Sequence, residues 1–272
     1  MKQQISFLAI ILPLAFLCGA RGTAAQAKYQ VETVVNGGDI EGTVKWSGPV
    51  PKNFSLPITK NADICDPKKR KDRSLERLEI GPDGGVANTV ISISGITHGK
   101  AMDLPVARRS LNQETCRYEP HILLVPQEGM LSMKSSDPIL HNIHMVGAAL
   151  YNLPFPIKDM VITRPMRKSG VVDIKCDAGH VWMNAEILVV TNPYYSVTDE
   201  HGHFELTNVP PGQYVLTAWH EGWTIAREEV VMDVDAHQEV RRPIFADPRT
   251  WNAKVTVSPK GTAKVDFTLS EN

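Results

Sequence analysis

The chain has 272 residues, with 29 Lys and Arg, 30 Asp and Glu, and four Cys. A formal charge of −1 offers no basic field to a polyanion, so we do not expect nucleic acid as a partner. The length is enough to bury the core of one large β domain or of two small ones.

The N-terminus has the pattern of a secretory signal peptide. Lys2 precedes an apolar run at residues 5–20, and residues 25–27 read Ala-Gln-Ala, a small-x-small cleavage signal. Cleavage after Ala27 leaves 245 residues, with 27 basic and 30 acidic side chains. We therefore expect residues 1–27 to be removed, a periplasmic or secreted location, and no transmembrane segment in the mature chain.

Short strands are predicted along the rest of the chain, because Val, Ile and Thr alternate with polar residues between Gly- and Pro-containing turns. The predicted strands are residues 42–48, 88–95, 121–126, 171–176, 185–190, 203–209, 213–220, 227–234, 254–258 and 263–269. Only the segment "LPVARRSLNQ", near residue 104, favours a short helix. This pattern predicts an all-β protein of the sandwich or Greek-key barrel type, with a boundary near residue 191.

Export would leave three cysteines, an odd number for an oxidising compartment. Cys65 and Cys116 lie in polar, loop-like segments, whereas Cys176 lies beside His180 and Met183. We therefore expect a disulfide between Cys65 and Cys116 and a free thiolate at Cys176. Spacing alone leaves the other pairings open.

The segment "CDAGHVWM", residues 176–183, holds a thiol, an imidazole and a thioether within eight residues. In the preceding strand Val172, Ile174 and Cys176 share one face, so the thiol is expected to point with the apolar core side chains. A type 1 copper site needs one thiolate, two imidazoles and a weak axial thioether. The loop supplies all of these except the second imidazole.

The second imidazole is expected from "SSDPILHNIHM". His141 and His144 differ by an odd number of positions, so on a strand they face opposite sides and only one can reach Cys176. Asn142 can hydrogen-bond across to the Cys176 loop and steady it. Soft sulfur with imidazole favours copper, although zinc remains possible if Met183 is not a ligand.

The upstream His-Asn pair, followed by the Cys-x3-His-x2-Met loop, resembles the cupredoxins, the plastocyanin and azurin class of blue copper proteins. The resemblance implies a cupredoxin-like Greek-key β-sandwich in residues 28–191. It also implies one type 1-like copper, with His141, Cys176 and His180 as equatorial ligands and Met183 as the axial ligand. The loop is shorter than is usual for that class.

The C-terminal segments "VTDEHGHFEL" and "VPPGQYVLTAWHE" resemble the transthyretin-like, or Cna-B type, regulatory module of carboxypeptidases. This implies a smaller β-sandwich in residues 192–272. The strand near residues 39–50 looks like the first strand of such a module, so the cupredoxin-like part is either inserted into the module or precedes it. The mature chain also resembles an exported bacterial family of carboxypeptidase regulatory-like or methylamine utilization proteins.

These observations predict an exported copper protein that exchanges one electron with an unidentified redox partner protein. An enzyme is not expected, because the chain lacks a nucleophile elbow, a phosphate loop and a haem-attachment motif. Two alternatives remain: a structural or binding protein of the cell envelope, with carbohydrate or protein contacts, and a copper storage or delivery protein. We expect His121 to support the copper loops by a hydrogen bond or to add a ligand.

Overall fold

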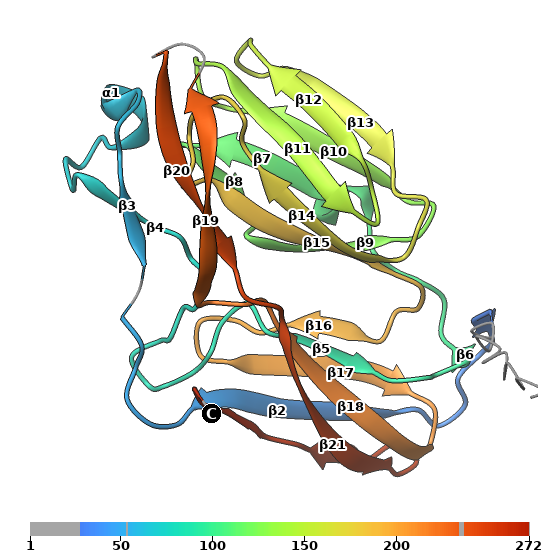
Figure 1. The fold of residues 1–272 in the computed structure, drawn as a ribbon. Coiled ribbons are helices and arrows are strands. Elements are labelled where there is room, and N and C mark those ends of the chain that lie inside the picture. Colours follow the sequence, from blue (N-terminus) through green and yellow to red (C-terminus); the bar gives the residue numbers. More distant parts are fainter. Residues whose placement is uncertain (1–27, 53, 234–236, 272) are drawn as a thin grey trace, which may run out of the picture.

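The protein forms two packed β-sandwiches crossed by a long hairpin (Figure 1). This computed structural model describes residues 28–52, 54–233 and 237–271, and the predicted signal peptide lies outside these ranges. Within them the helices are α1 (Ala62–Cys65) and the 3-10 turn η1 (Val106–Arg108). The prediction of an all-β protein is therefore confirmed. No helix in the described ranges has the length and apolarity needed to span a bilayer.

The first sandwich is built from residues 110–190. The strands of its first sheet are β7 (Ser110–Glu114), β8 (Arg117–Glu119), β10 (Met130–Ser135) and β13 (Val161–Pro165), in the order β13-β10-β7-β8. Those of its second sheet are β9 (Ile122–Pro126), β11 (His141–Gly147), β12 (Tyr151–Phe155), β14 (Gly170–Lys175) and β15 (Asn184–Val190), in the order β12-β11-β14-β15-β9. Leu111 and Met133 of one sheet pack with Ile143 and Ile187 of the other in one buried core.

The second sandwich takes its strands from both sides of the first in sequence. Its strands are β2 (Gly38–Trp46), β5 (Val90–Ile93), β16 (Tyr195–Val197), β17 (His203–Val209), β18 (Gly212–His220), β21 (Arg249–Val257), β22 (Thr262–Lys264) and β23 (Phe267–Leu269). They form sheets β16-β5-β18-β21 and β17-β2-β22, and β23 also pairs with β2. The range 28–191 therefore includes two strands, β2 and β5, that pair with strands beyond residue 194.

The two sandwiches contact each other along β15. Its side chains are buried on both faces: Ala185 and Ile187 belong to the core of the first sandwich, whereas Leu188 and Val190 pack with Val90 of the second. A strand covered on both sides reads as a continuous apolar run, as "ILVV" at residues 187–190 does. The outer face of the β12-β11-β14-β15-β9 sheet is therefore partly covered by the second sandwich.

A hairpin of β19 (Ile225–Asp233) and β20 (Gln238–Phe245) leaves the second sandwich between β18 and β21 and runs along the first (Figure 1). Beside the end of β19 at Asp233 lies α1, flanked by the paired strands β3 (Ser55–Pro57) and β4 (Asp72–Ser74). A short parallel pair, β1 (Gln30–Val31) and β6 (His98–Gly99), completes the described strands. The end of β19 and α1 thus lie together at one end of the first sandwich.

Each strand predicted from alternation overlaps a strand of the structure, and the short helix expected near residue 104 is limited to three residues. That segment contains only the turn η1, and Ser110–Glu114 forms β7. Leu111 and Gln113 of β7 are fully buried, so burial against the second sheet decides the conformation there.

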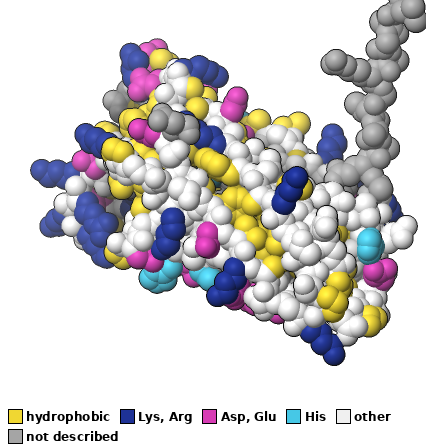
Figure 2. Space-filling view, turned by 90° about the horizontal axis from the view of Figure 1, so that it is seen from below, with side chains coloured by type: hydrophobic (Ala, Val, Ile, Leu, Met, Phe, Trp, Pro, Cys, Tyr) yellow, Lys and Arg dark blue, Asp and Glu magenta, His cyan; other side chains and the backbone are white. Residues whose placement is uncertain are grey.

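The surface carries side chains of both charges. Figure 2 shows a strip of hydrophobic side chains across the face seen from below, with Lys and Arg mainly toward its edges. In this view of the described residues basic and acidic side chains are interspersed, as the nearly balanced formal charge predicts.

Candidate metal centre

His141, Cys176 and His180 lie together inside the first sandwich, and each has 0% of its surface exposed. One ligand atom from each residue lies within 4.8 Å of those of the other two. The Sγ of Cys176 is 3.8 Å from the Nδ1 of His180, and the two imidazole centroids are 4.7 Å apart. The structure therefore brings together three of the four residues predicted as metal ligands.

Strand geometry decides which of the two upstream histidines joins the thiol. Cys176 directly follows β14, whose Ile174 points into the core as predicted. The neighbouring strand β11 begins at His141, which also points inward. His144 points outward, where its Nδ1 is 2.6 Å from the Oδ2 of Asp177. The odd separation of the two histidines thus places His141, and not His144, beside Cys176.

Asp137 orients the ring of His141. Its Oδ2 is 2.8 Å from the Nε2 of His141, and its carboxylate accepts the backbone N–H groups of Thr115 and Cys116, each at 2.8 Å. Burial opposes ionisation of Asp137, but these hydrogen bonds lower the pKa of its carboxyl below the ordinary value. The Nε2 of His141 is therefore occupied by Asp137, and the buried Nδ1 has no hydrogen-bond partner among the described residues. Nδ1 is the nitrogen of this ring that is available to a metal.

Asn61 orients the ring of His180 in the same way. Its Oδ1 is 3.0 Å from the Nε2 of His180, which leaves Nδ1 toward Cys176. Asn61 is the N-cap residue of α1, yet its side chain makes no capping hydrogen bond. The predicted disulfide between Cys65 and Cys116 is confirmed, and it attaches α1 to the first sandwich. The disulfide therefore helps to hold Asn61 against the candidate metal ligands.

The environment of Cys176 favours the thiolate. Burial raises the pKa of the thiol, but the neighbouring rings of His141 and His180 outweigh burial and lower it to about 6. Burial also disfavours the charged form of His141. The contacts of His141 with Asp137 and Cys176 outweigh burial and raise the pKa of this histidine. The thiolate is the form of cysteine that binds a metal, so the folded protein holds this ligand ready at neutral pH.

The hairpin and the segment before α1 hold the ligand loop from outside. Arg242 of β20 donates from Nη2 to the carbonyl oxygen of Cys176 at 2.7 Å. The Nζ of Lys60 donates to the carbonyl oxygen of Ala178 at 2.9 Å and lies 3.0 Å from the Oδ1 of Asp233, at the end of β19. Two successive parts of the loop are therefore fixed by residues far away in sequence.

Inside the loop, a glycine allows the close approach of the hairpin. Gly179 has φ +86°, and a Cβ there would lie 2.6 Å from the Oδ2 of Asp233, so a larger residue would be strained and crowded. The predicted cross-loop bond is present, since Asn142 accepts the N–H of Asp177 at 3.2 Å. The ring of Trp182 packs at 5.5 Å from that of His180 and covers this side of the centre.

The other two residues considered as ligands lie differently. Met183 is 2% exposed and its backbone N–H donates to the carbonyl oxygen of His180 at 2.9 Å, but its axial role stays a prediction. The expectation for His121 is wrong. Its Nε2 bonds to Glu221 of the second sandwich, and His121 belongs to none of the close ligand groups in the described residues.

Sequence reasoning missed Asp137, Asn61 and Arg242 as partners of the candidate ligands. Asp137 has a usable signal, because it lies four residues before His141 in the same segment. Asn61 and Arg242 are separated from their partners by 119 and 66 residues, and nothing local marks them.

One part of the chain matches a protein-family model. Residues 191–244 match the model described as "BOS complex subunit NOMO1-like, second beta sandwich domain". This range includes β16 to β19 and most of β20. The match indicates a β-sandwich relationship for this part of the chain. Comparison with curated proteins gives no match.

Among solved structures, the chain shows similarity to cupredoxins and to a copper-containing reductase. A purple cupredoxin from Nitrosopumilus maritimus has 18% identity and a TM-score of 0.27, over 30% of this chain and 98% of that chain. An oxidised amicyanin variant has 19% identity and a TM-score of 0.28, over 33% of this chain and 89% of that chain. A copper-containing nitrite reductase from Thermus scotoductus has 17% identity and a TM-score of 0.27, over 34% of this chain and 24% of that chain. At such values the similarity carries no argument about function.

Proposed function

We propose that the protein binds one copper ion through His141, Cys176 and His180 and acts as an exported one-electron carrier. The observation that carries the proposal is the close group of two imidazoles and one free thiol, all fully buried. Two imidazoles with a thiolate are the equatorial ligand set of blue copper sites. The unpartnered Nδ1 of His141 fits this role, because a metal would satisfy it.

The competing ligand groups contain sulfur that is not available. Cys65 and Cys116 also lie within 4.8 Å of a candidate histidine nitrogen, but the two sulfurs form the disulfide. Cys176 is the free cysteine of the described residues. The thiolate in our proposal is therefore assigned to Cys176, and the nitrogen ligands to the two rings beside it.

Bound copper would supply reversible exchange between two oxidation states. The chain would supply a rigid ligand set: Asp137 and Asn61 fix the two rings through Nε2, and Arg242 fixes the Cys176 carbonyl. Preorganised ligands need little rearrangement when the charge of the site changes. Met183 is proposed as the weak axial ligand.

The cellular role is part of the same proposal. The pattern of residues 1–27 supports export to the periplasm or beyond the cell, with cleavage after Ala27. A carrier without catalytic activity needs a redox partner protein, which is unidentified. Metal-binding and electrochemical experiments test the copper site and the electron transfer on which this role depends.

The first test is to add Cu(II) to the purified protein and record visible absorption and electron paramagnetic resonance. We expect intense thiolate-to-copper absorption that is lost in Cys176→Ser and in His141→Ala. His144→Ala is the matched control, because His144 lies on the other face of β11, and it should keep the colour. A coloured Cys176→Ser protein would refute the ligand assignment.

Two outcomes would favour the alternative functions. Tight, reversible binding of Cu(I) without a reversible voltammetric wave would support copper storage or delivery. A protein that binds no copper and keeps full stability would support a structural or binding role in the envelope.

A further inference from the structure

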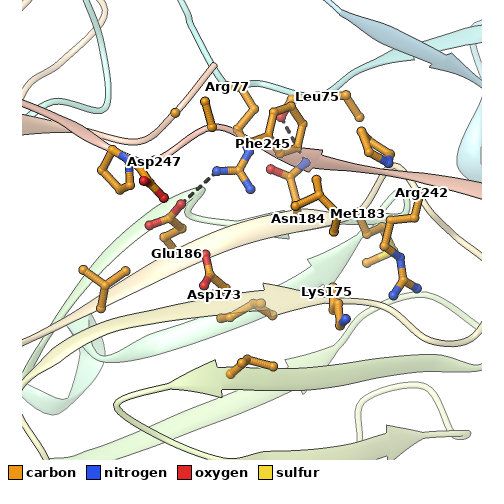
Figure 3. Close-up of a pocket in the computed structure, with 18 of the residues that line it drawn as sticks. Leu75, Arg77, Asp173, Lys175, Met183, Asn184, Glu186, Arg242, Phe245 and Asp247 are labelled. Atoms are coloured by element: carbon orange, nitrogen blue, oxygen red, sulfur yellow. Dashed lines mark hydrogen bonds and ion pairs between the residues drawn. The ribbon is translucent and has the colours of Figure 1, made fainter. Parts of the chain in front are cut away.

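A cavity of about 410 Å³ lies beside the candidate metal centre, where the outer face of β14 and β15 meets β20 (Figure 3). Its wall is mostly apolar and includes Val146, Val171, Val181, Pro243, Ile244 and Phe245. Sites for small organic molecules have volumes of about 300–1,000 Å³ and a mainly apolar lining with a few polar groups. The cavity is therefore of a size and character suited to a small ligand.

The carboxyl groups of the cavity gather at one end. Figure 3 shows Asp173, Glu186 and Asp247 toward that end, with Arg77 beside Glu186, whereas Lys175 and Arg242 lie at the other end. Glu186 is 2% exposed, and the two aspartates are exposed. The cavity thus has an acidic end that includes one deeply buried carboxyl group.

The basic side chains of the cavity already have carboxylate partners. The Nζ of Lys175 is 3.6 Å from the Oε1 of Glu229, and the Nη1 of Arg242 is 3.1 Å from the Oδ1 of Asp177. The guanidinium of Arg77 contacts two carboxylates, one on β15 and one just after β18. An anionic ligand would therefore have to displace existing ion pairs.

The acidic groups, in contrast, have unused acceptor atoms. The Oε1 of Glu186 accepts from Arg77 at 2.8 Å, but its buried Oε2 has no hydrogen-bond partner. Asp173 and Asp247 make no ion pair with any other described residue. An isolated buried carboxyl oxygen costs free energy, and a ligand that donates hydrogen bonds would remove this cost.

The electrostatics of Glu186 also suit a cationic ligand. Burial and the nearby charge of Glu221 raise the pKa of Glu186 well above its ordinary range, although Arg77 opposes this. A cationic ligand would favour the ionised form of Glu186.

We propose that this cavity binds a compact organic cation, with an ammonium group at Glu186, Asp173 and Asp247 and an apolar body against β20. An ammonium group has three donors, which matches the unused acceptors of the acidic end. A bare metal ion fits less well, because these three carboxyl groups are absent from the close ligand groups of the described residues.

Calorimetric titration of the purified protein with three probes of one shape tests the proposal. We expect phenethylammonium to bind, with phenethyl alcohol weaker by at least about tenfold and hydrocinnamate weaker still. No binding of the ammonium probe, or equal binding of the carboxylate probe, would overturn the proposal.

Variants of two acidic residues locate the site. Glu186→Gln keeps the shape and the acceptor for Arg77, and we expect it to weaken phenethylammonium binding by at least about tenfold. Asp173→Asn should also weaken phenethylammonium binding. Because Asp173 is exposed, this variant provides the test if Glu186→Gln folds poorly. Glu200→Gln is the matched control, because its side chain is 84% exposed and outside the cavity. Unchanged affinity in both cavity variants would contradict the assignment.

This inference is independent of the proposed copper function. Cys176→Ser removes the thiolate ligand but leaves the cavity lining intact. That variant should bind phenethylammonium with unchanged affinity even if the wild-type protein proves to bind no copper.

Discussion

Cys176 combines complete burial with a lowered pKa, which is unusual for a thiol. Burial in an apolar core raises a thiol pKa, because the charged form loses its hydration. Here two histidine rings compensate and lower the pKa to about 6. A purely structural buried cysteine would have no need of such partners, so the local chemistry supports a role that uses the thiolate.

The ionisation of Cys176 can be measured directly in the metal-free protein. We expect ultraviolet thiolate absorbance to rise with a midpoint near pH 6 and the step to be lost in Cys176→Ser. Because the folded pKa lies below the unfolded value of about 8.5, the thiolate stabilises the fold at alkaline pH. That contribution is lost as the pH falls through about 6. A midpoint near the ordinary thiol value would contradict the proposed interaction with the histidines.

At the same scale, the sequence allowed the ligand types to be predicted but not their supports. Alternation along β14 placed Cys176 on the core side, and the parity of His141 and His144 showed that only one could join it. The ring supports, Asp137 and Asn61, could not be found by periodicity, because hydrogen bonds to Nε2 depend on tertiary position.

The β19–β20 hairpin is an element whose function lies outside its own sandwich. It extends from the second sandwich and bonds to the ligand loop of the first directly through Arg242, while Asp233 pairs with Lys60, which bonds to Ala178 of the loop. The Arg242 side chain is 7% exposed and also bonds to Asp177. The hairpin therefore couples the position of the ligand loop to the second sandwich.

Replacement of Arg242 tests this coupling. Arg242→Met keeps the length of the side chain but removes its bonds to the Cys176 carbonyl and Asp177, so we expect a loss of about 2 kcal/mol in the free energy of unfolding. Hydrogen exchange of residues 176–180 should also become faster. Arg241→Met is the control, since Arg241 is 73% exposed, and it should change stability by less than about 0.5 kcal/mol. Equal protection of the loop in both variants would show that the hairpin does not hold it.

Sequence patterns identified 11 of the 23 strands of the described residues but not their associations. The strand β19 matches a segment predicted from its alternation, whereas its partner β20 contacts the ligand loop through Arg242, 66 positions from Cys176. The helix expected near residue 104 is limited to η1, because the following residues pair in β7 with Leu111 and Gln113 buried. Local propensity gives way where tertiary packing decides the conformation.

For the whole molecule, the order of strands in sequence differs from their order in space. The first sandwich lies between β5 and β16, which are paired neighbours in the second. The sequence suggested this arrangement only through the resemblance of the strand near residues 39–50 to a module otherwise located at the C-terminus. The buried ion pairs that join the sandwiches gave no sequence signal, because Arg77 is 109 and 144 residues from its partners.

Arg77 is the central residue of that junction. Its guanidinium contacts Glu186 of the first sandwich and Glu221 of the second, and Glu221 also bonds to His121 of the first. Burial opposes ionisation of Glu221, but Arg77 and His121 overcome it and lower its pKa. The charge of Arg77 therefore allows one buried carboxylate to join the two sandwiches.

Removal of this charge should separate the unfolding of the two sandwiches. Arg77→Met leaves two buried carboxyl groups without their cation, so we expect a loss of about 3 kcal/mol in stability. Scanning calorimetry should then resolve two transitions in place of a single cooperative one. Lys45→Met is the matched control, because the side chains of its ion pair with Asp83 are 38% and 47% exposed, and it should leave the transition unchanged. One unshifted transition in Arg77→Met would mean that the apolar contacts around β15 are sufficient to hold the sandwiches together.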